Sequence, residues 1–328
     1  MLAAHYERTG PADEVLTVDS VPDPVPGPGE LRVRLRWSGV NPSDVKTRAG
    51  LRNPVLPFPR VIPHSDGMGV VDAVGAGVAP QRVGERVWLW NAAWGRADGT
   101  AAQFVVLPQD QAIALPEGVP DEAGACLGIP ALTALHAVLA QGGVEDRQVL
   151  VAGGAGAVGH YAIQFARLLG ARQVLATVSS PAKAALATAA GANVVIDYRR
   201  EDVVTRVRES TGGRGVDRVI EVDIAANGGL DAELMRSGGD WMVYGSGQGQ
   251  FSLPFFPLIA KNQNLHFFIV YNLEPAQRSR AETVLTDLLR RGALIHNIGE
   301  RLPLAQVARA HELVERGEVM GNVVLAIP

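Results

Sequence analysis

A glycine-rich turn near the middle of the chain constrains the fold more than any other segment. The apolar residues 149–151 have the composition of a strand, and residues 154–159 (GAGAVG) match the pattern G-x-G-x-x-G. An amphipathic helical pattern then runs to Gly170. A strand that turns through such a loop into a helix offers free backbone N–H groups and the positive end of the helix dipole to a phosphate. The segment therefore predicts a dinucleotide-binding βαβ unit.

Each glycine of this pattern has an expected role. Gly154 is expected to permit the tight strand-to-helix turn, Gly156 to let the backbone approach a pyrophosphate, and Gly159 to let helix and strand pack closely. Glycine-rich loops are common, so the pattern alone is a weak signal. Its position between a strand and a helix favours nucleotide binding over a purely structural turn.

The second half of the chain alternates strand-like and helix-like segments. The spacing predicts strands at 148–152, 173–178, 193–197, 216–222, 239–245 and 265–270, with helices near 158–170, 181–190, 201–210 and 228–236. Strands joined in this way by crossover helices form a doubly wound parallel sheet.

The first part of the chain has a different residue pattern, with short strand-like segments and few helical ones. Residues 31–40 (LRVRLRWSGV) alternate as in a half-buried strand, and Pro/Gly-rich turns such as 22–30 separate such segments. This pattern predicts a compact, barrel-like β unit. After a helix near 277–292 the chain is expected to leave the parallel sheet, and a last helix (305–316) and strand (321–327) are expected to return to the β unit.

The β-rich pattern and the alternating strand–helix pattern together predict two domains in an α/β protein. A helical segment begins near residue 122, so we expect a discontinuous β-rich domain formed by residues 1–122 and 293–328, and a nucleotide-binding domain formed by residues 123–292. A chain of 328 residues is long enough for two cores of this size.

Composition narrows the class of protein. The net charge of −4 gives no reason to expect nucleic acid or an anionic membrane as a partner. Cys126 is the only cysteine, so an intrachain disulfide is excluded. No apolar run approaches the roughly 18 residues that a membrane span needs, and the first ten residues lack the plan of a signal peptide. We therefore expect a soluble, cytoplasmic protein.

The residues after the second strand of the parallel sheet bear on the choice of nucleotide. An Asp or Glu at this place binds the ribose 2′-OH of NAD and repels a 2′-phosphate. Here residues 177–180 read TVSS, without a carboxylate, and Lys183 follows. Hydroxyls and a lysine suit a phosphate, although Lys183 could also be an ordinary exposed residue of the next helix. The missing acid predicts NADPH rather than NADH.

Taken together, these features resemble the medium-chain dehydrogenase/reductase superfamily, and within it the zinc-independent quinone oxidoreductases related to zeta-crystallin. The resemblance covers essentially the whole chain. It is carried by residues 39–50 (GVNPSDVKTRAG), 63–78 (PHSDGMGVVDAVGAGV), 83–87 (VGERV), 128–138 (GIPALTALHAV), 192–199 (ANVVIDYR), 215–222 (GVDRVIEV) and 310–325 (AHELVERGEVMGNVVL), with the glycine loop. It implies a GroES-like β-rich catalytic domain beside a Rossmann domain that binds NADPH.

The resemblance also implies which residues form the site. Asn41 and Thr133 would line the nicotinamide end of an interdomain cleft and take part in catalysis. The expected cofactor-binding residues are these two with Gly156, Ala157, Val158, Gly159, Ser179, Lys183, Tyr198, Tyr244 and Asn322. Relatives often carry tyrosines where this chain has Lys46 and Arg52, which leaves the substrate less certain than the reaction class.

No metal site is expected. A catalytic zinc needs about three ligands from Cys, His and carboxylates. Zinc-dependent relatives carry a cysteine where this chain has Asn41, and alignment of their Gly-His-Glu on Asp66 places Ser65 at the histidine position. His64 beside Asp66 makes a poor zinc site without a third ligand, so a structural or hydrogen-bonding role is expected for His64.

The resulting functional prediction is an enzyme, a zinc-independent NADPH-dependent reductase of quinones. Without a metal to polarise an alcohol oxygen, hydride delivery suits an acceptor that is already electrophilic. An NADPH-dependent enone or alkenal double-bond reductase is the alternative within enzymes, and a zinc alcohol dehydrogenase comes third. A non-catalytic NADPH-binding protein is the alternative from another class. The resemblance also implies a homodimer, because relatives commonly pair the edge strands of their cofactor sheets. Residues 265–271 (LHFFIVY) are apolar enough to form such an edge.

Overall fold

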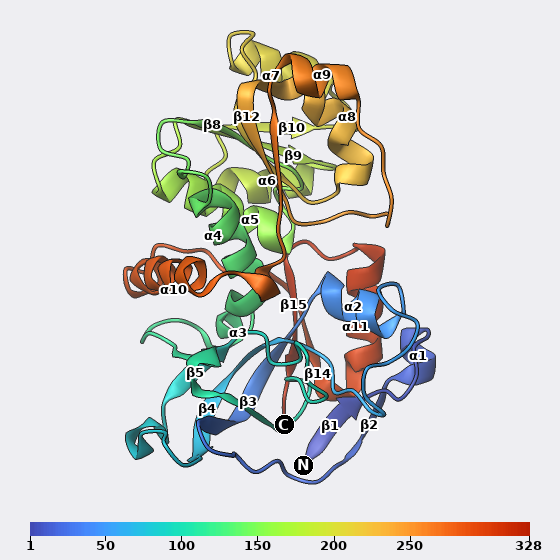
Figure 1. Ribbon diagram of the computed structural model, residues 1–328, viewed down its shortest axis with the longest axis vertical. Helices are drawn as coiled ribbons and strands as arrows, with labels where there is room; N and C mark the ends of the chain where they lie inside the picture. Colours follow the sequence, from blue (N-terminus) through green and yellow to red (C-terminus); the bar gives the residue numbers. More distant parts are fainter. The chain divides into compact units, whose positions relative to one another are not determined.

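The computed structural model describes residues 1–328, which divide into two units (Figure 1). Unit 1 contains residues 1–130 and 286–328, and unit 2 contains residues 131–285. The first boundary lies after the predicted one at residue 122 because the short helix α3 (Asp121–Gly124) packs on strands of unit 1. The second boundary lies before the predicted one at residue 292, inside helix α10 (Pro275–Arg290).

Unit 2 contains the expected six-stranded parallel sheet. Its strands lie in the order β10-β9-β8-β11-β12-β13, which is the order of a Rossmann fold. The elements are α4 (Leu132–Leu139), β8 (Gln148–Val151), α5 (Ala157–Leu168), β9 (Gln173–Val178), α6 (Pro181–Ala189), β10 (Val194–Asp197), α7 (Val203–Ser210), β11 (Val216–Glu221), α8 (Ile224–Leu234), β12 (Met235–Val243), α9 (Phe255–Ala260) and β13 (Asn264–Phe267). The strand order reverses between β8 and β11, the place where such sheets bind nucleotides.

The helices of unit 2 form two groups. Helix α5 contacts α4 and α6, whereas α8 contacts α7 and α9. The central strands are buried between them: Leu150, Val219 and Trp241 have essentially no exposed surface. Strands covered on both faces account for the nearly continuous apolar runs in this part of the sequence.

Unit 1 is built mainly of antiparallel strands. Its large sheet has the order β14-β15-β3-β4-β5-β7, with β6 also paired to β3, and a separate ribbon pairs β1 with β2. The elements are β1 (Leu2–His5), α1 (Ala12–Val15), β2 (Thr17–Ser20), β3 (Glu30–Val40), α2 (Pro42–Arg48), β4 (Asp66–Val74), β5 (Arg86–Leu89), β6 (Phe104–Pro108), β7 (Ala112–Ala114), β14 (Ile298–Pro303), α11 (Val307–Arg316) and β15 (Asn322–Ala326).

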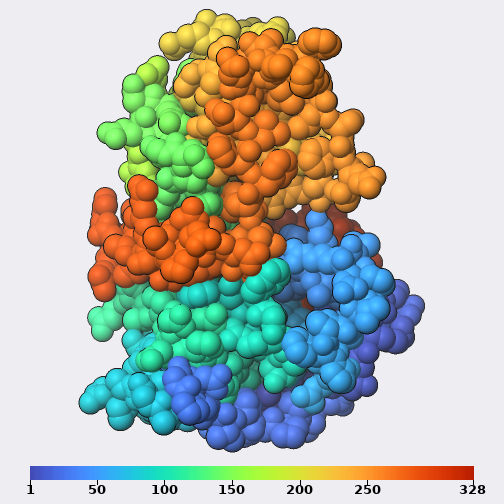
Figure 2. All heavy atoms as spheres, viewed as in Figure 1, coloured from blue at the N-terminus to red at the C-terminus, as the bar shows by residue number.

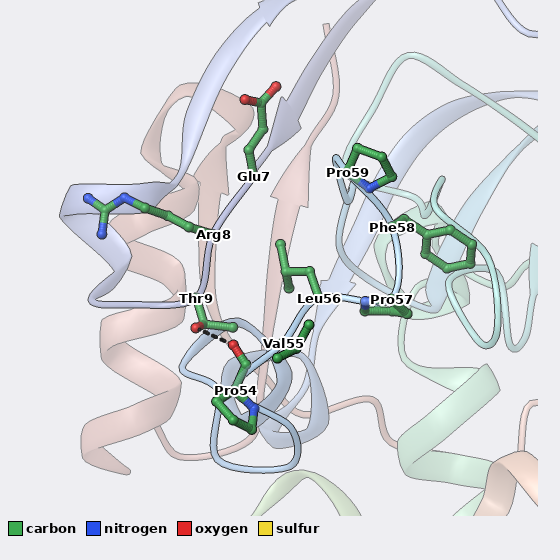
Figure 3. Close-up of a pocket in the computed structure, with 9 residues that line it drawn as sticks. All are labelled: Glu7, Arg8, Thr9, Pro54, Val55, Leu56, Pro57, Phe58 and Pro59. Carbon is green, nitrogen blue, oxygen red and sulfur yellow. Dashed lines mark hydrogen bonds between the residues drawn. The ribbon is translucent and has the colours of Figure 1, made fainter.

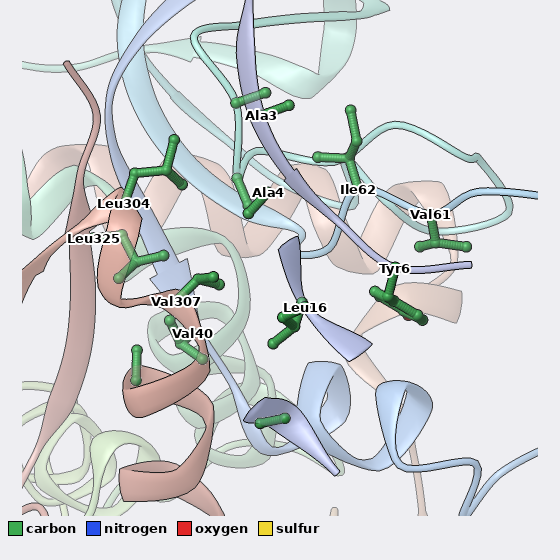
Figure 4. Packing of buried hydrophobic residues seen from close by; sticks show 14 of the residues in the cluster. Ala3, Ala4, Tyr6, Leu16, Val40, Val61, Ile62, Leu304, Val307 and Leu325 are labelled. Carbon is green, nitrogen blue, oxygen red and sulfur yellow. The ribbon is translucent and has the colours of Figure 1, made fainter. Parts of the chain in front are cut away.

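The two ends of the chain share one core in unit 1. Ala4 and Tyr6 from the N-terminal segment belong to the same hydrophobic cluster as Val307 and Leu325 from the C-terminal segment (Figure 4). Strand β15 pairs with β3 in antiparallel register, and α11 packs on α1, α2 and β15. No helix has both the length and the apolar composition that crossing a membrane requires.

Candidate functional site

The glycine loop joins β8 to α5 at the reversal point of the parallel sheet. The structure corrects the role expected for Gly154: the left-handed backbone that the turn requires lies at Gly153, with a φ of +68°. Gly154 is needed for packing instead, since a Cβ there would lie 2.8 Å from the Cβ of Ala176 and 2.9 Å from Cδ1 of Ile163.

Gly156 and Gly159 differ in what surrounds them. A Cβ on Gly159 would overlap the carbonyl oxygen of Gly153, so this glycine allows the helix to approach the loop. Gly156 is exposed, and a Cβ there would meet only the Gly153 oxygen at 3.3 Å. Ala157 and Val158 form the first turn of α5, where backbone N–H groups have no partner within the helix. This geometry suits a bound pyrophosphate.

Three of the predicted cofactor residues come together after β9 and β10. The ammonium of Lys183 donates a hydrogen bond to Ser179 Oγ at 3.1 Å. The backbone N–H of Tyr198 donates to the carbonyl of Val178 at 3.1 Å, which places Tyr198 beside Ser179, and its side chain is 52% exposed. A hydroxyl and a cation are therefore joined at one corner of the sheet, next to the backbone of an exposed tyrosine and with no carboxylate at the end of β9.

Two further predicted residues of unit 2, Tyr244 and Thr133, are connected through the rings of Phe268 and His136. The rings of Tyr244 and Phe268 have centroids 6.3 Å apart, and Phe268 lies 4.6 Å from the ring of His136. His136 stands one turn after the buried Thr133 on α4. Burial and the nearby Arg278 lower the pKa of His136 to about 4, so its ring is neutral at pH 7.

In unit 1, Asn41 is held by two carboxyl groups. It caps the N-terminus of α2, and its backbone N–H donates to Asp44 Oδ2 at 2.8 Å. Its side-chain Nδ2 donates to Asp66 Oδ2, also at 2.8 Å. Both acids are buried, and burial raises the pKa of Asp44 to about 7 and that of Asp66 well above its usual range. Sequence reasoning identified Asn41 but not these partners.

The side chain of His64 is engaged in hydrogen bonds on both ring nitrogens. Nδ1 lies 2.8 Å from Ser38 Oγ, and Nε2 lies 2.9 Å from Nε2 of His311 on α11. Burial lowers the pKa of His64 to about 3. The expected hydrogen-bonding role of His64 agrees with this arrangement.

The residues around Asn41 do not fit a catalytic zinc. Ser65 and Asn41 occupy the positions where zinc-dependent relatives carry ligands, and both nitrogens of His64 already have partners. Asp66 binds the Asn41 amide, and no group of three His, Cys, Asp or Glu side chains is arranged to hold a metal.

Asn322, predicted to close the site, begins β15 in unit 1. It is buried, and its Nδ2 donates to the carbonyl of Asn297 at 2.9 Å. The predicted site residues are thus divided between the units, with Asn41 and Asn322 in unit 1 and the others in unit 2.

A hollow on the surface of unit 1 contains none of these residues. Its volume is about 580 Å³, and Thr9 Oγ1 donates to the carbonyl of Pro54 across it at 3.0 Å (Figure 3). It is lined by Glu7, Arg8, Thr9 and residues 54–59. Proline and aliphatic side chains make up most of its walls, and its polar side chains are Glu7, Arg8 and Thr9.

Each of the two units contains a match to a known protein family. Residues 27–117 match the alcohol dehydrogenase GroES-like domain, and residues 157–290 match the zinc-binding dehydrogenase family. A quinone oxidoreductase from Pseudomonas aeruginosa is 31% identical, with 95% of each chain covered. A 2-haloacrylate reductase from a Burkholderia species is 29% identical, with 99% of this chain and 98% of that protein covered.

Solved structures agree with these matches over nearly the whole chain. A protein described as an NAD-dependent alcohol dehydrogenase superimposes with a TM-score of 0.91 at 32% identity, with both chains fully covered. The Escherichia coli quinone oxidoreductase complexed with NADPH superimposes with a TM-score of 0.88 at 26% identity, covering 99% of this chain and all of that one. The predicted fold class is confirmed, and the chain is an oxidoreductase that belongs to the quinone oxidoreductase branch of the medium-chain dehydrogenase/reductase superfamily.

Proposed function

We propose that this protein is a zinc-independent, NADPH-dependent reductase of quinones. The observation that carries the proposal is the set of donors around Asn41. The Asn41 amide is held by the buried Asp66 and can bind and orient a ligand. His64, which is near Asp66 in the sequence, has both ring nitrogens engaged with Ser38 and His311, so these residues offer no ligand set for a metal. A substrate that is already electrophilic needs no Lewis acid.

Residues of unit 2 would hold the cofactor. The exposed Gly156 and the first turn of α5 are suited to the pyrophosphate, and Ser179 with Lys183 to the 2′-phosphate. When bound, NADPH supplies a hydride. The Escherichia coli relative was solved with NADPH, which supports this choice, whereas the relative described as NAD-dependent makes the nucleotide preference a point to measure.

Residues of both units would act on the reacting groups by binding and orientation. We assign Asn41 and Thr133 to the nicotinamide end, where a buried amide and a hydroxyl can hold a carboxamide or a carbonyl oxygen. Asn322 would act from unit 1. No side chain is required to protonate the hydroquinone, because its oxygens can take protons from solvent.

Reduction of an activated carbon–carbon double bond is the second candidate. The 29% identity to a 2-haloacrylate reductase favours it, since that protein's name describes an unsaturated, electron-poor substrate. Enones and alkenals share this property. They demand the same cofactor site and differ in the atom that receives the hydride.

We also propose a homodimer formed through the edge of the parallel sheet. Strand β13 is the last strand of the sheet, and Phe267 on it is 59% exposed. Helix α9 adds Phe255, Phe256 and Ile259, which are 65%, 79% and 55% exposed. The orange stretch that contains both elements lies on the surface of unit 2 (Figure 2). An apolar, unpaired edge of this kind favours pairing with a second copy.

Initial rates test the proposed activity. NADPH and NADH consumption are measured with 1,4-benzoquinone and with 2-cyclohexenone, with and without EDTA. We expect quinone reduction that prefers NADPH and is unchanged by the chelator. Turnover of the enone alone would favour the second candidate, and loss of activity with EDTA would contradict zinc independence. Tight NADPH binding without any turnover would indicate a non-catalytic protein.

A further inference from the structure

Five buried groups in unit 1 form one continuous row of hydrogen bonds. His311 Nε2 lies 2.9 Å from His64 Nε2, and His64 Nδ1 lies 2.8 Å from Ser38 Oγ. Ser38 Oγ lies 2.8 Å from Thr100 Oγ1, which in turn binds the carbonyl oxygen of Asp66. All five residues have no exposed surface. The row joins α11, near the end of the chain, to the residue that binds Asn41.

The direction of this row follows from its last member. A carbonyl oxygen can only accept, so Thr100 must donate its single hydroxyl hydrogen to Asp66. Thr100 Oγ1 is then an acceptor toward Ser38, and Ser38 must donate its own hydrogen to Thr100. Ser38 Oγ therefore has only a lone pair left for His64.

The same reasoning determines both imidazoles. His64 must carry a hydrogen on Nδ1, which donates to Ser38. Its ring is neutral at pH 7, because burial lowers its pKa to about 3, so its Nε2 has no hydrogen. His311 must then donate from Nε2 to His64. Burial, with His64 and Arg48 nearby, lowers the pKa of His311 well below its ordinary value, so His311 is also neutral and its Nδ1 has no hydrogen.

His64 has an unfavourable backbone conformation, which the surrounding structure must stabilise. Its φ is +79°, in the left-handed region that glycine adopts readily and other residues rarely. The carbonyls of Pro63 and His64 accept backbone hydrogen bonds from Ala101 and Thr100, and the carbonyl of Ser65 accepts one from Ala92. The rings of His64 and His311 stack with centroids 5.1 Å apart and an angle of 26° between their planes. A non-glycine residue persists in such a conformation when its surroundings over-determine it.

We propose that His311, His64, Ser38 and Thr100 are positioning residues. They form a one-way chain of hydrogen bonds that fixes the peptide of Asp66, and through the Asp66 carboxyl it orients the amide of Asn41. The chain ends on a carbonyl oxygen, so it holds geometry and does not conduct protons. The effect on turnover rests on the proposed function, in which Asn41 acts at the nicotinamide end.

The tautomers provide a test that does not depend on activity. The protein is labelled with ¹⁵N-histidine, and signals of His64 and His311 are identified among the seven histidines with single variants. At pH 7 we expect His64 protonated only at Nδ1 and His311 only at Nε2. The opposite tautomers, or an imidazolium at either residue, would overturn the proposal.

Thr100 provides a matched pair of variants for the positioning effect. T100V keeps the shape of the side chain but removes the hydroxyl, whereas T100S keeps the hydroxyl. We expect T100V to lower kcat for quinone reduction about tenfold, the effect of a small displacement near reacting groups. The KM for NADPH should change less than about twofold in T100V, and T100S should retain wild-type kcat. Equal kcat in folded T100V and wild-type protein would overturn the proposal.

Hydrogen exchange of the Asn41 side-chain amide separates this inference from the proposed function. We expect the amide hydrogens to exchange slowly in the wild type and T100S, and faster in T100V. H311Q, which retains a donor toward His64, should behave as the wild type, and H311L should resemble T100V. If the wild-type protein reduces no quinone, the proposed function fails, but the tautomers and amide exchange still decide the positioning role. Unchanged exchange in T100V and H311L would refute it.

Discussion

Two side chains after β9 bear directly on the choice of nucleotide. Lys183 is hydrogen-bonded to Ser179 Oγ, and Tyr198 lies beside them, so a 2′-phosphate would find a cation and a hydroxyl in one place. The end of the strand has no carboxylate to bind a ribose 2′-OH. The proposed preference for NADPH would therefore depend on attraction of the phosphate as well as on the missing acid.

Removal of the cation should reduce that preference. In K183A we expect the KM for NADPH to rise about tenfold, as for loss of a charge-assisted hydrogen bond, with the KM for NADH unchanged. Steady-state kinetics with both nucleotides measure this. R200A is the control, because Arg200 is also exposed and cationic but lies 3.7 Å from Asp197. An equal rise in both KM values would contradict a specific role for Lys183.

Asp44 should make stability depend on pH near neutrality. Burial raises its pKa to about 7 in the folded protein, against 3.8 for the free side chain. Its contribution to stability is therefore complete below pH 3.8 and is lost as the pH rises through 7. We expect wild type to lose about 2 kcal/mol more unfolding free energy than D44N between pH 5 and 8.

Denaturant unfolding at several pH values checks this difference. Asn at position 44 retains an oxygen that can accept the Asn41 N–H, so D44N changes the titration more than the cap. Other buried groups titrate in both proteins, and comparison of the two curves isolates Asp44. Parallel curves would contradict the prediction.

The residues that hold Asn41 could not be predicted from the sequence. The resemblance marks Asn41 through its motif, but His64 and His311 are separated by 247 positions, and no local pattern links them. Asp66 was visible only as a residue near the zinc-ligand positions. The hydrogen bonds that assemble the group depend on tertiary packing of α11 against α1, α2 and β15 within unit 1.

At the scale of elements, the two glycines of the α5 turn should respond differently to alanine. In G159A the new Cβ would overlap the Gly153 carbonyl, which belongs to backbone and cannot move away cheaply. We expect a loss of about 2 kcal/mol of unfolding free energy, as for overpacking. In G156A the backbone φ of −76° and the exposed position accept a Cβ, so stability should change by less than about 0.5 kcal/mol.

The same two variants distinguish a loss of stability from a loss of NADPH affinity. G156A should weaken NADPH affinity although it remains stable, because its Cβ would lie where the pyrophosphate approaches the backbone. Chemical denaturation and fluorescence titration with NADPH measure the two properties. Equal stability of G156A and G159A would show that the close contact between Gly159 and the Gly153 carbonyl does not affect the free energy of unfolding.

Most strands of unit 2 could be predicted to within a few residues, because buried parallel strands are short apolar runs with turn residues between them. The helices were less regular. The helical segment expected from about residue 122 is interrupted by a π-helical turn at Leu127–Ala131, which contains Pro130, a residue without a backbone N–H. Helix α8 begins at Ile224 rather than near 228, since Asp223 caps it and the glycines at 228 and 229 hide its pattern.

At the scale of the whole molecule, unit 1 depends on both ends of the chain. Strand β15 pairs with β3, and residues of α11 share a core with the N-terminal strand β1. The sequence predicted this return through a last helix and strand. Such a discontinuous domain places residues from the two ends in one packed interior, which is how His311 reaches His64.

The exposed edge of unit 2 should make the protein a dimer. We expect a mass in solution of twice the chain mass of 34.7 kDa, measured by light scattering. A lysine at position 267 would place charge on the edge strand and oppose pairing, so F267K should be monomeric at micromolar concentration. V25K is the matched control, since Val25 is 82% exposed in unit 1 and its replacement should leave the dimer intact. A monomeric wild type, or a dimeric F267K, would show that β13 is not the dimer edge.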